Sequence, residues 1–214
     1  DQHYPDVTGL AGGDFVVTWG DETTHANRPG TDTSGWGVFG QVFTTSNADG
    51  DAAVTMSGDQ FQLNSTTNST QNDVSVVTLT DGNFVATWYN GNNNDIRAQV
   101  FSNDGSKVGG EIEVDEDNAF SSSQPSITAL ADGGFAVSWM SDYRDSPNET
   151  GGFHHSYGVF ARQFDNDGNG KLDFAEFIEL FCSGMFKFRL DEQDVIASWA
   201  ISVLDRRDIH VRVH

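Results

Sequence analysis

The most informative segment is Gly13–Trp19, which reads GDFVVTW. It returns with the same alternation of residue types at Gly82–Trp88 (GNFVATW) and at Gly133–Trp139 (GGFAVSW). A period of two is typical of a β-strand that buries one face. We therefore predict a repeated β unit whose tryptophans occupy equivalent buried positions: Trp19, Trp88 and Trp139.

Further alternating segments flank each copy and extend it to a four-strand unit. The segment that follows ends in Phe each time: Gly37–Phe43, Asp95–Phe101 and Gly158–Phe164. A fourth segment is clear in two copies, Gly58–Asn64 and Gly109–Asp115. Asp-Gly pairs between the first two strands favour tight hairpins, because Gly accepts a positive φ without steric cost.

This pattern predicts a mainly β protein of tandem four-stranded antiparallel repeats, similar to the blades of a propeller. The repeats occupy residues 1–164, at about 4–70, 72–121 and 123–168, and a C-terminal segment spans 165–214. A β-sandwich of tandem units is the structural alternative. Three blades do not close a propeller, so the chain is a fragment, or several chains complete a ring, or the units stack differently.

The order of these segments resembles the roughly 50-residue repeats of very large secreted or surface bacterial proteins of the adhesin-like class. The resemblance covers about residues 4–168 and rests on the strand pair around each Trp, the segment ending in Phe, and the Asn-Asp-Gly that follows it. It implies a structural role without catalytic residues. The glycine-rich nonapeptide that binds calcium in some such proteins is absent from this sequence.

One twelve-residue stretch, 165–176, carries the strongest chemical signal, and it resembles the calcium loop of the EF-hand family. Calcium takes six to eight oxygen ligands, and the spacing of acids, amides and one glycine here can supply them. Gly170 stands where the loop must turn sharply. The predicted Ca²⁺ ligands are Asp165, Asp167, Asn169, Lys171 through its carbonyl, Asp173, and Glu176.

A bare hairpin turn is the competing interpretation of this stretch, because Phe164–Gly168 also aligns with Phe101–Gly105 of the second repeat. The residues before the loop, 157–164, are a strand in the repeat register, although Val159, Phe160 and Phe164 also fit one face of an entering helix.

After the loop the apolar spacing changes to three and four, which predicts a small α-helical, EF-hand-like C-terminal segment. A first helix covers Phe174–Phe181, and a second runs from Asp191 or Glu192 to Leu204. The tail Ile209–His214 alternates apolar and basic residues and fits an edge strand instead.

The formal net charge is −21, from 32 acidic and 11 basic side chains, which repels phosphate backbones and disfavours nucleic-acid binding. No apolar run approaches the ~20 residues that span a membrane. The chain begins at Asp1 without a signal peptide, as expected of a processed or partial product. Three glycosylation sequons suit a secreted protein: Asn64, Asn68 and Asn148.

No nucleophile and base stand out, so we predict that the protein is not an enzyme. His154 and His155 are adjacent on a chain and do not readily chelate one ion, and Cys182 fits core packing. Trp36, Tyr89 and Tyr157 could stack on sugar rings or fill the core.

The sequence thus predicts a calcium-binding, non-catalytic structural or adhesion protein of the extracellular space or cell surface. Its expected partners are calcium and either glycans or further copies of the repeat protein. A carbohydrate-binding, lectin-like propeller module is the alternative function.

Overall fold

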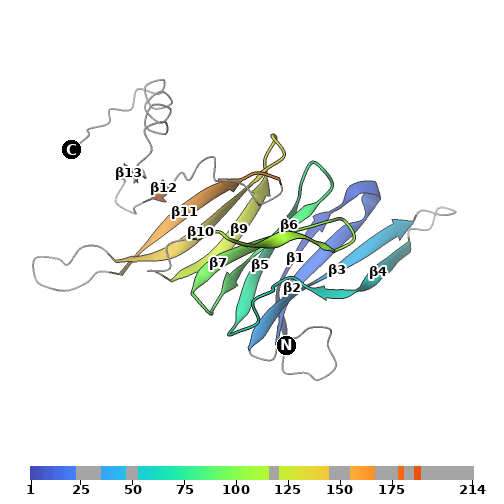
Figure 1. Ribbon diagram of the computed structural model, residues 1–214, viewed down its shortest axis with the longest axis horizontal. Helices are drawn as coiled ribbons and strands as arrows, with labels where there is room; N and C mark the ends of the chain where they lie inside the picture. The colour runs from blue at the N-terminus through green and yellow to red at the C-terminus, as the bar shows by residue number, and fades with distance from the viewer. Residues whose placement is uncertain are drawn as a thin grey trace, which may run out of the picture.

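The computed structural model describes residues 1–22, 35–46, 53–115, 121–144, 155–166, 178–180 and 186–188. Within these ranges the chain forms β-sheets joined by turns, with a single 3₁₀ turn at Ala11–Gly13 and no α-helix (Figure 1). The predicted mainly β class is confirmed, whereas neither a closed propeller nor an EF-hand segment is present in the described part of the chain.

Three antiparallel sheets follow one another along the chain, and we call them modules 1, 2 and 3. Module 1 has the order β1-β2-β3-β4, module 2 the order β5-β6-β7-β8, and module 3 the order β11-β10-β9. The strands of module 1 are Gln2–Gly9, Phe15–Glu22, Trp36–Ser46 and Ala53–Gln62. Those of module 2 are Gln71–Thr78, Phe84–Asn90, Asp95–Phe101 and Lys107–Glu113. Those of module 3 are β9 at Ser122–Ala129, β10 at Phe135–Arg144 and β11 at His155–Phe164.

The repeated sequence produces repeated geometry in all three modules. The first Phe of the quoted stretch pairs with the Phe that ends the third strand, and the two rings stack at 5.0 Å in module 1, 5.1 Å in module 2 and 5.0 Å in module 3. Four residues further on, each Trp of the second strand faces an equivalent residue of the third: Trp19 faces Phe39, Trp88 faces Arg97, and Trp139 faces Phe160. The three tryptophans are therefore equivalent in register, as predicted. Trp88 and Trp139 are also buried as predicted, whereas Trp19 is only half-buried.

The Asp-Gly turns are tight hairpins, as predicted. Leu79 N donates to Asn83 O at 2.8 Å, and Leu130 N donates to Gly134 O at 2.8 Å. Gly82 and Gly133 have φ of +93° and +97°, in the left-handed region that glycine enters without a Cβ clash.

Residues 157–164 belong to β11, which pairs with β10 without interruption from Phe135↔Phe164 to Arg144↔His155. The strand is confirmed and the entering helix is excluded. The repeat register therefore predicted the correct structure for a segment whose apolar spacing alone fitted both a strand and a helix.

The predicted helix Phe174–Phe181 is wrong at its described residues, because Ile178–Leu180 is strand β12 and pairs with β13, Phe186–Phe188. A short apolar run with Ile and Phe fits a strand as well as a helix, and antiparallel pairing with a second aromatic run satisfies its backbone. The rest of that helix, the helix ending at Leu204 and the tail Ile209–His214 lie outside the described residues.

The first strand of each module bulges at one residue in the left-handed region: Tyr4, Asp73 and Gln124, with φ of 53°, 59° and 53°. Each lies next to the register shift in the pairing of that strand with the second. A bulge increases local twist and bends the strand. The first strands of successive modules lie side by side, β1 against β5 and β5 against β9.

The bulge at Asp73 yields a pH prediction. Burial raises the pKa of the Asp73 carboxyl, opposed by a hydrogen bond from the Gln124 backbone. A raised pKa in the folded state means that stability falls as pH rises through the ordinary carboxyl range. Asp73→Asn should therefore raise Tm at pH 7, and the gain should disappear near pH 3. Thermal unfolding at both pH values measures it.

Asp104 supplies a control of opposite sign. Hydrogen bonds from Ser102 and Ser106 lower the pKa of its exposed carboxyl. Its contribution is present above the ordinary carboxyl pKa and is lost on acidification, so Asp104→Asn should lower Tm at pH 7 and not at pH 3. If Asp73→Asn and Asp104→Asn changed Tm in the same direction at pH 7, the opposite pKa shifts assigned to the two carboxyls would be contradicted.

Candidate functional site

The predicted calcium loop begins at a well-fixed point of the fold. Phe164, the last residue of β11, is buried and stacks on Phe135, and Asp165 follows it in an exposed position. The other predicted ligands lie outside the described residues: Asp167, Asn169, Lys171, Asp173 and Glu176. Within the described ranges no cluster of three or more His, Cys, Asp or Glu side chains could hold a metal ion. The calcium site remains a prediction.

The corresponding turn of module 2 satisfies its own polar groups without a cation. Ser102 N donates to Ser106 O at 2.9 Å, and Asp104 Oδ1 accepts bonds from Ser102 Oγ at 2.5 Å and from Ser106 N at 2.9 Å. This is the geometry that the bare-turn interpretation assigns to the turn after β11. Module 3 replaces Ser102 by Asp165, which adds a carboxylate where module 2 has a hydroxyl.

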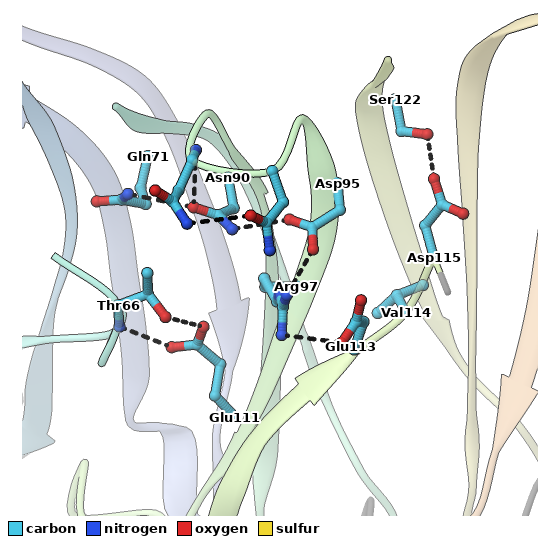
Figure 2. Close-up of polar contacts among 12 residues, drawn as sticks. Thr66, Gln71, Asn90, Asp95, Arg97, Glu111, Glu113, Val114, Asp115 and Ser122 are labelled. Carbon is cyan, nitrogen blue, oxygen red and sulfur yellow. Dashed lines mark hydrogen bonds and ion pairs between the residues drawn. The ribbon is translucent and has the colours of Figure 1, made fainter. Parts of the chain in front are cut away.

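Outside this loop, the most elaborate polar arrangement is a line of buried amides at the junction of modules 1 and 2 (Figure 2). Asn64 Nδ2 donates to Gln71 Oε1 at 3.0 Å, Gln71 Nε2 to Asn90 Oδ1 at 3.4 Å, and Asn90 Nδ2 to Asp95 Oδ1 at 2.8 Å. Asn64 Oδ1 also accepts the backbone N–H of Val38 at 3.1 Å. These hydrogen bonds link the end of module 1 to the first three strands of module 2.

Arg97 closes this line at its charged end (Figure 2). Its Nη2 lies 2.6 Å from Asp95 Oδ2, and its Nη1 lies 3.5 Å from Glu113 Oε2. The Asp95 side chain is fully buried and that of Glu113 is 36% exposed, so the first contact is the desolvated one. Although burial lowers the pKa of Arg97, the hydrogen bond and charge of Asp95, together with the charges of Glu113 and Glu111, outweigh this effect and raise the pKa, which keeps the guanidinium charged.

Two residues of β8 hold the linker that leads from module 1 to module 2. Glu111 Oε2 accepts the backbone N–H groups of Ser65 at 2.7 Å and Thr66 at 3.3 Å, and its Oε1 accepts the Thr66 hydroxyl at 3.0 Å. Lys107 Nζ donates to Ser65 Oγ at 2.8 Å. The linker is therefore fastened by the module that follows it.

The junction of modules 2 and 3 repeats the same design with different residues. Ser122 Oγ donates to Asp115 Oδ2, and these two residues take the places of Gln71 and Asn64. Arg162 on β11 is buried, donates from Nη1 to Val114 O at 2.7 Å and lies over the Phe164 ring at 5.6 Å. In the other modules this register position holds Gln41 and Gln99, whose amide nitrogens donate to carbonyls of their own fourth strand, Ser57 O and Val108 O.

These contacts link each module to the next. The Asp95 carboxylate is engaged by an amide and a guanidinium, and the amides are bonded to one another. Sequence reasoning missed this network. A signal existed, because Asn64 and Asp115 end the two copies of the fourth repeated segment.

The structure also places the aromatic and glycosylation candidates. Tyr89 packs against the core between modules 2 and 3, and Trp36 is half-buried beside the His3 ring at 4.9 Å. Asn64 is buried and its amide nitrogen is bonded, so a glycan does not fit there. Asn68 is exposed, and Tyr157 and Asn148 have no described side chain.

The sequon difference gives a further prediction. If the chain passes through a eukaryotic secretory pathway, Asn68 should be occupied and Asn64 should remain bare, because Asn68 is exposed whereas Asn64 is buried. Peptide mapping of chain expressed in a eukaryotic secretory host measures this. A glycan at Asn64 would show that modification precedes formation of the junction.

No family model matches the chain, and no curated protein matches it. Among solved structures, a protein of unknown function from Dyadobacter fermentans is similar, with 10% sequence identity and a TM-score of 0.48. The match covers 89% of this chain and 56% of that one, so the chain spans little more than half the length of that protein. Within the described residues, no helix has the length and apolar character needed to cross a membrane.

Proposed function

We propose that the protein is a non-catalytic, calcium-binding structural or adhesion protein of the extracellular space or cell surface, built from propeller-like β modules. The observation that carries the structural part is the repeated junction: Asn64 with Gln71 in one place, Asp115 with Ser122 in the other. Buried polar side chains that only join one module to the next serve a scaffold of repeats, in which each unit is stabilised by its neighbours.

The acidic loop supports the calcium part. Its first predicted ligand, Asp165, follows a residue anchored in the module 3 core, so one end of the loop is held in place. Four carboxylates within twelve residues repel one another in the absence of a cation. The net charge of −21 further raises the local concentration of divalent cations.

Calorimetric titration tests the calcium proposal. We expect uptake of calcium with Kd of about 10⁻⁵ to 10⁻³ M, since no paired loop is visible in the sequence. Glu176→Gln should weaken binding sharply because it removes the charged bidentate ligand. Asn166→Ala, at a non-ligand position of the same loop, should leave it nearly unchanged.

Two results would reject the calcium site. One is the absence of heat at millimolar calcium, and the other is equal behaviour of the Glu176 and Asn166 variants. Either would favour the bare turn, whose geometry the Ser102–Ser106 turn displays in module 2.

A lectin-like function is a second candidate, favoured by the half-buried Trp36 ring beside His3 at the edge of module 1. Aromatic faces of this kind stack on sugars. A glycan-array signal that is lost in Trp36→Ala and kept in Tyr89→Phe would support it, because Tyr89 packs into the core instead.

A further inference from the structure

The modules pack through two different faces, and the same pair of faces meets at both junctions. Module 2 presents an aromatic face to module 1, made of Val74, Val76, Phe84, Ala86, Trp88 and Phe101. Module 1 presents a mainly aliphatic face in return, made of Val16, Val38, Val42 and Leu63, with the Phe61 ring packed against it. At the second junction the aliphatic face of module 2 includes Val85, Ile96, Ala98 and Val100, and the aromatic face of module 3 includes Phe135, Val137, Trp139 and Phe164.

Within the described residues, no other module packs against the aromatic face of module 1. Its apolar members follow from the strand register: Val7, Phe15, Val17, Trp19, Phe39 and Phe43, of which Phe39 is 2% exposed. Val7 is 59% exposed, whereas Val76 at the same position of module 2 is 6% exposed. Trp19 is only half-buried, whereas Trp88 and Trp139 are buried. Met56, which pairs with Phe43 on the same side of the sheet, is 71% exposed and widens the apolar surface.

Module 3 lies at the opposite end of the described row of modules from module 1 (Figure 1), and its aliphatic face is also partly accessible. Val159 occupies the register position of Val38 and Ile96. It is 41% exposed, whereas both counterparts are fully buried. Ala136 and Ala161 on the same side are also more accessible than their counterparts Val85 and Ala98.

We propose that the aromatic face of module 1 binds the aliphatic face of module 3 of a second copy of this chain. This contact continues the interface that occurs twice inside the chain, aliphatic face of one module on aromatic face of the next. An exposed apolar surface of this continuity marks an association site. The proposal is independent of calcium binding.

The contact joins two different surfaces, so it is heterologous, and a heterologous contact generates a closed ring or an open filament. The described modules of two copies number six, which falls within the roughly four to eight blades of closed propellers. The bulge that bends each first strand recurs in every module, which gives successive modules the same turn. We therefore expect a closed dimer.

The test is the solution mass of the full chain, by sedimentation velocity at roughly 100 µM protein, where micromolar assemblies are populated. It should be run at about 0.15 M and 0.5 M salt, because the net charge of −21 per chain opposes association and salt screens it. We expect twice the chain mass, with a larger dimer fraction at the higher salt.

Three lysine variants locate the contact. Val7→Lys disrupts the aromatic face of module 1, and Val159→Lys disrupts the aliphatic face of module 3. Asn93→Lys adds the same charge in the exposed turn between β6 and β7, away from both faces. Each of the first two should be monomeric, with dimerisation weakened at least tenfold, and the third should match the parent. Lysine lowers the net negative charge, so a loss of association is not attributable to general repulsion.

Mixing the two monomeric variants distinguishes head-to-tail contact from other modes. Each retains the face that the other has lost, so one of the two contacts of the ring is restored and a mixed dimer should form. The proposal is overturned if the parent chain is monomeric under both salt conditions. It is also overturned if Val159→Lys dimerises like the parent, which would indicate that two aromatic faces meet. Circular dichroism of each variant should match the parent, which excludes unfolding as the cause of the monomeric state.

Discussion

Replacing Trp88 by alanine should lower the free energy of unfolding by about 3–5 kcal/mol, the usual cost of removing a large aromatic side chain from a core. Trp88 is fully buried and belongs to the core between modules 1 and 2. Its loss removes apolar area from the contact that joins the two modules and leaves a cavity behind. Urea unfolding followed by far-ultraviolet circular dichroism measures the change without relying on tryptophan emission.

The matched control is Trp19→Ala, the same substitution at the same register position of module 1. Because Trp19 is only half-buried, the dilute monomer should lose clearly less stability than with Trp88→Ala. At high protein concentration the stability losses of the two variants should become more similar, because the proposed association covers the ring of Trp19. Equal losses in the dilute protein would contradict the view that the two positions differ only by the presence of a neighbouring module.

Removing Asp95 should have an effect of similar size for an electrostatic reason. Asp95→Ala leaves the Arg97 guanidinium without its 2.6 Å partner and leaves the Asn90 amide without an acceptor. Breaking a buried ion pair on one side typically costs about 3–5 kcal/mol. Arg97 is 15% exposed, so water offers some compensation and the lower end of this range is expected.

Two further variants separate the charge from the packing. Glu113→Ala removes the other carboxylate beside Arg97, which lies 3.5 Å from its Nη1 and belongs to a side chain that is 36% exposed. This change should lower the free energy of unfolding by no more than about 1 kcal/mol. The double change Asp95→Ala with Arg97→Leu should cost less than the sum of the single changes, because no buried charge is left unpaired. Strict additivity in this cycle would show that the pair contributes no coupling.

The strands could be predicted from the sequence because the repeat supplied independent copies of each one. A single GDFVVTW stretch is consistent with several structures, but three copies with Phe and Trp four residues apart predict a common register. That register decided the strand at 157–164, where apolar spacing alone left two possibilities. The short Ile178–Leu180 run had no second copy, and there the helical interpretation was wrong.

The junction residues were not predicted because their role is defined between modules rather than within a strand. Asn64 and Gln71 differ from Asp115 and Ser122 in residue type, although each pair makes the same connection. An Asn in a polar linker normally indicates a turn or a sequon. Its burial follows only from the packing of the next module, which no local pattern encodes. The six predicted calcium ligands differ in this respect, because their spacing is local and can be read from the sequence. Five of them lie outside the described residues, so the site stays a prediction.

The order of the strands has a consequence for how the chain folds. Every pairing within the three modules joins strands that are consecutive in sequence. No strand has to wait for a distant partner, so loop closure costs little and contact order within each module is low for a β protein. A module can therefore form soon after its last strand leaves the ribosome, and each completed sheet offers its aliphatic face to the next. Pulsed hydrogen exchange during refolding should show protection of backbone N–H groups within modules 1, 2 and 3 before the backbone N–H groups at the junctions are protected.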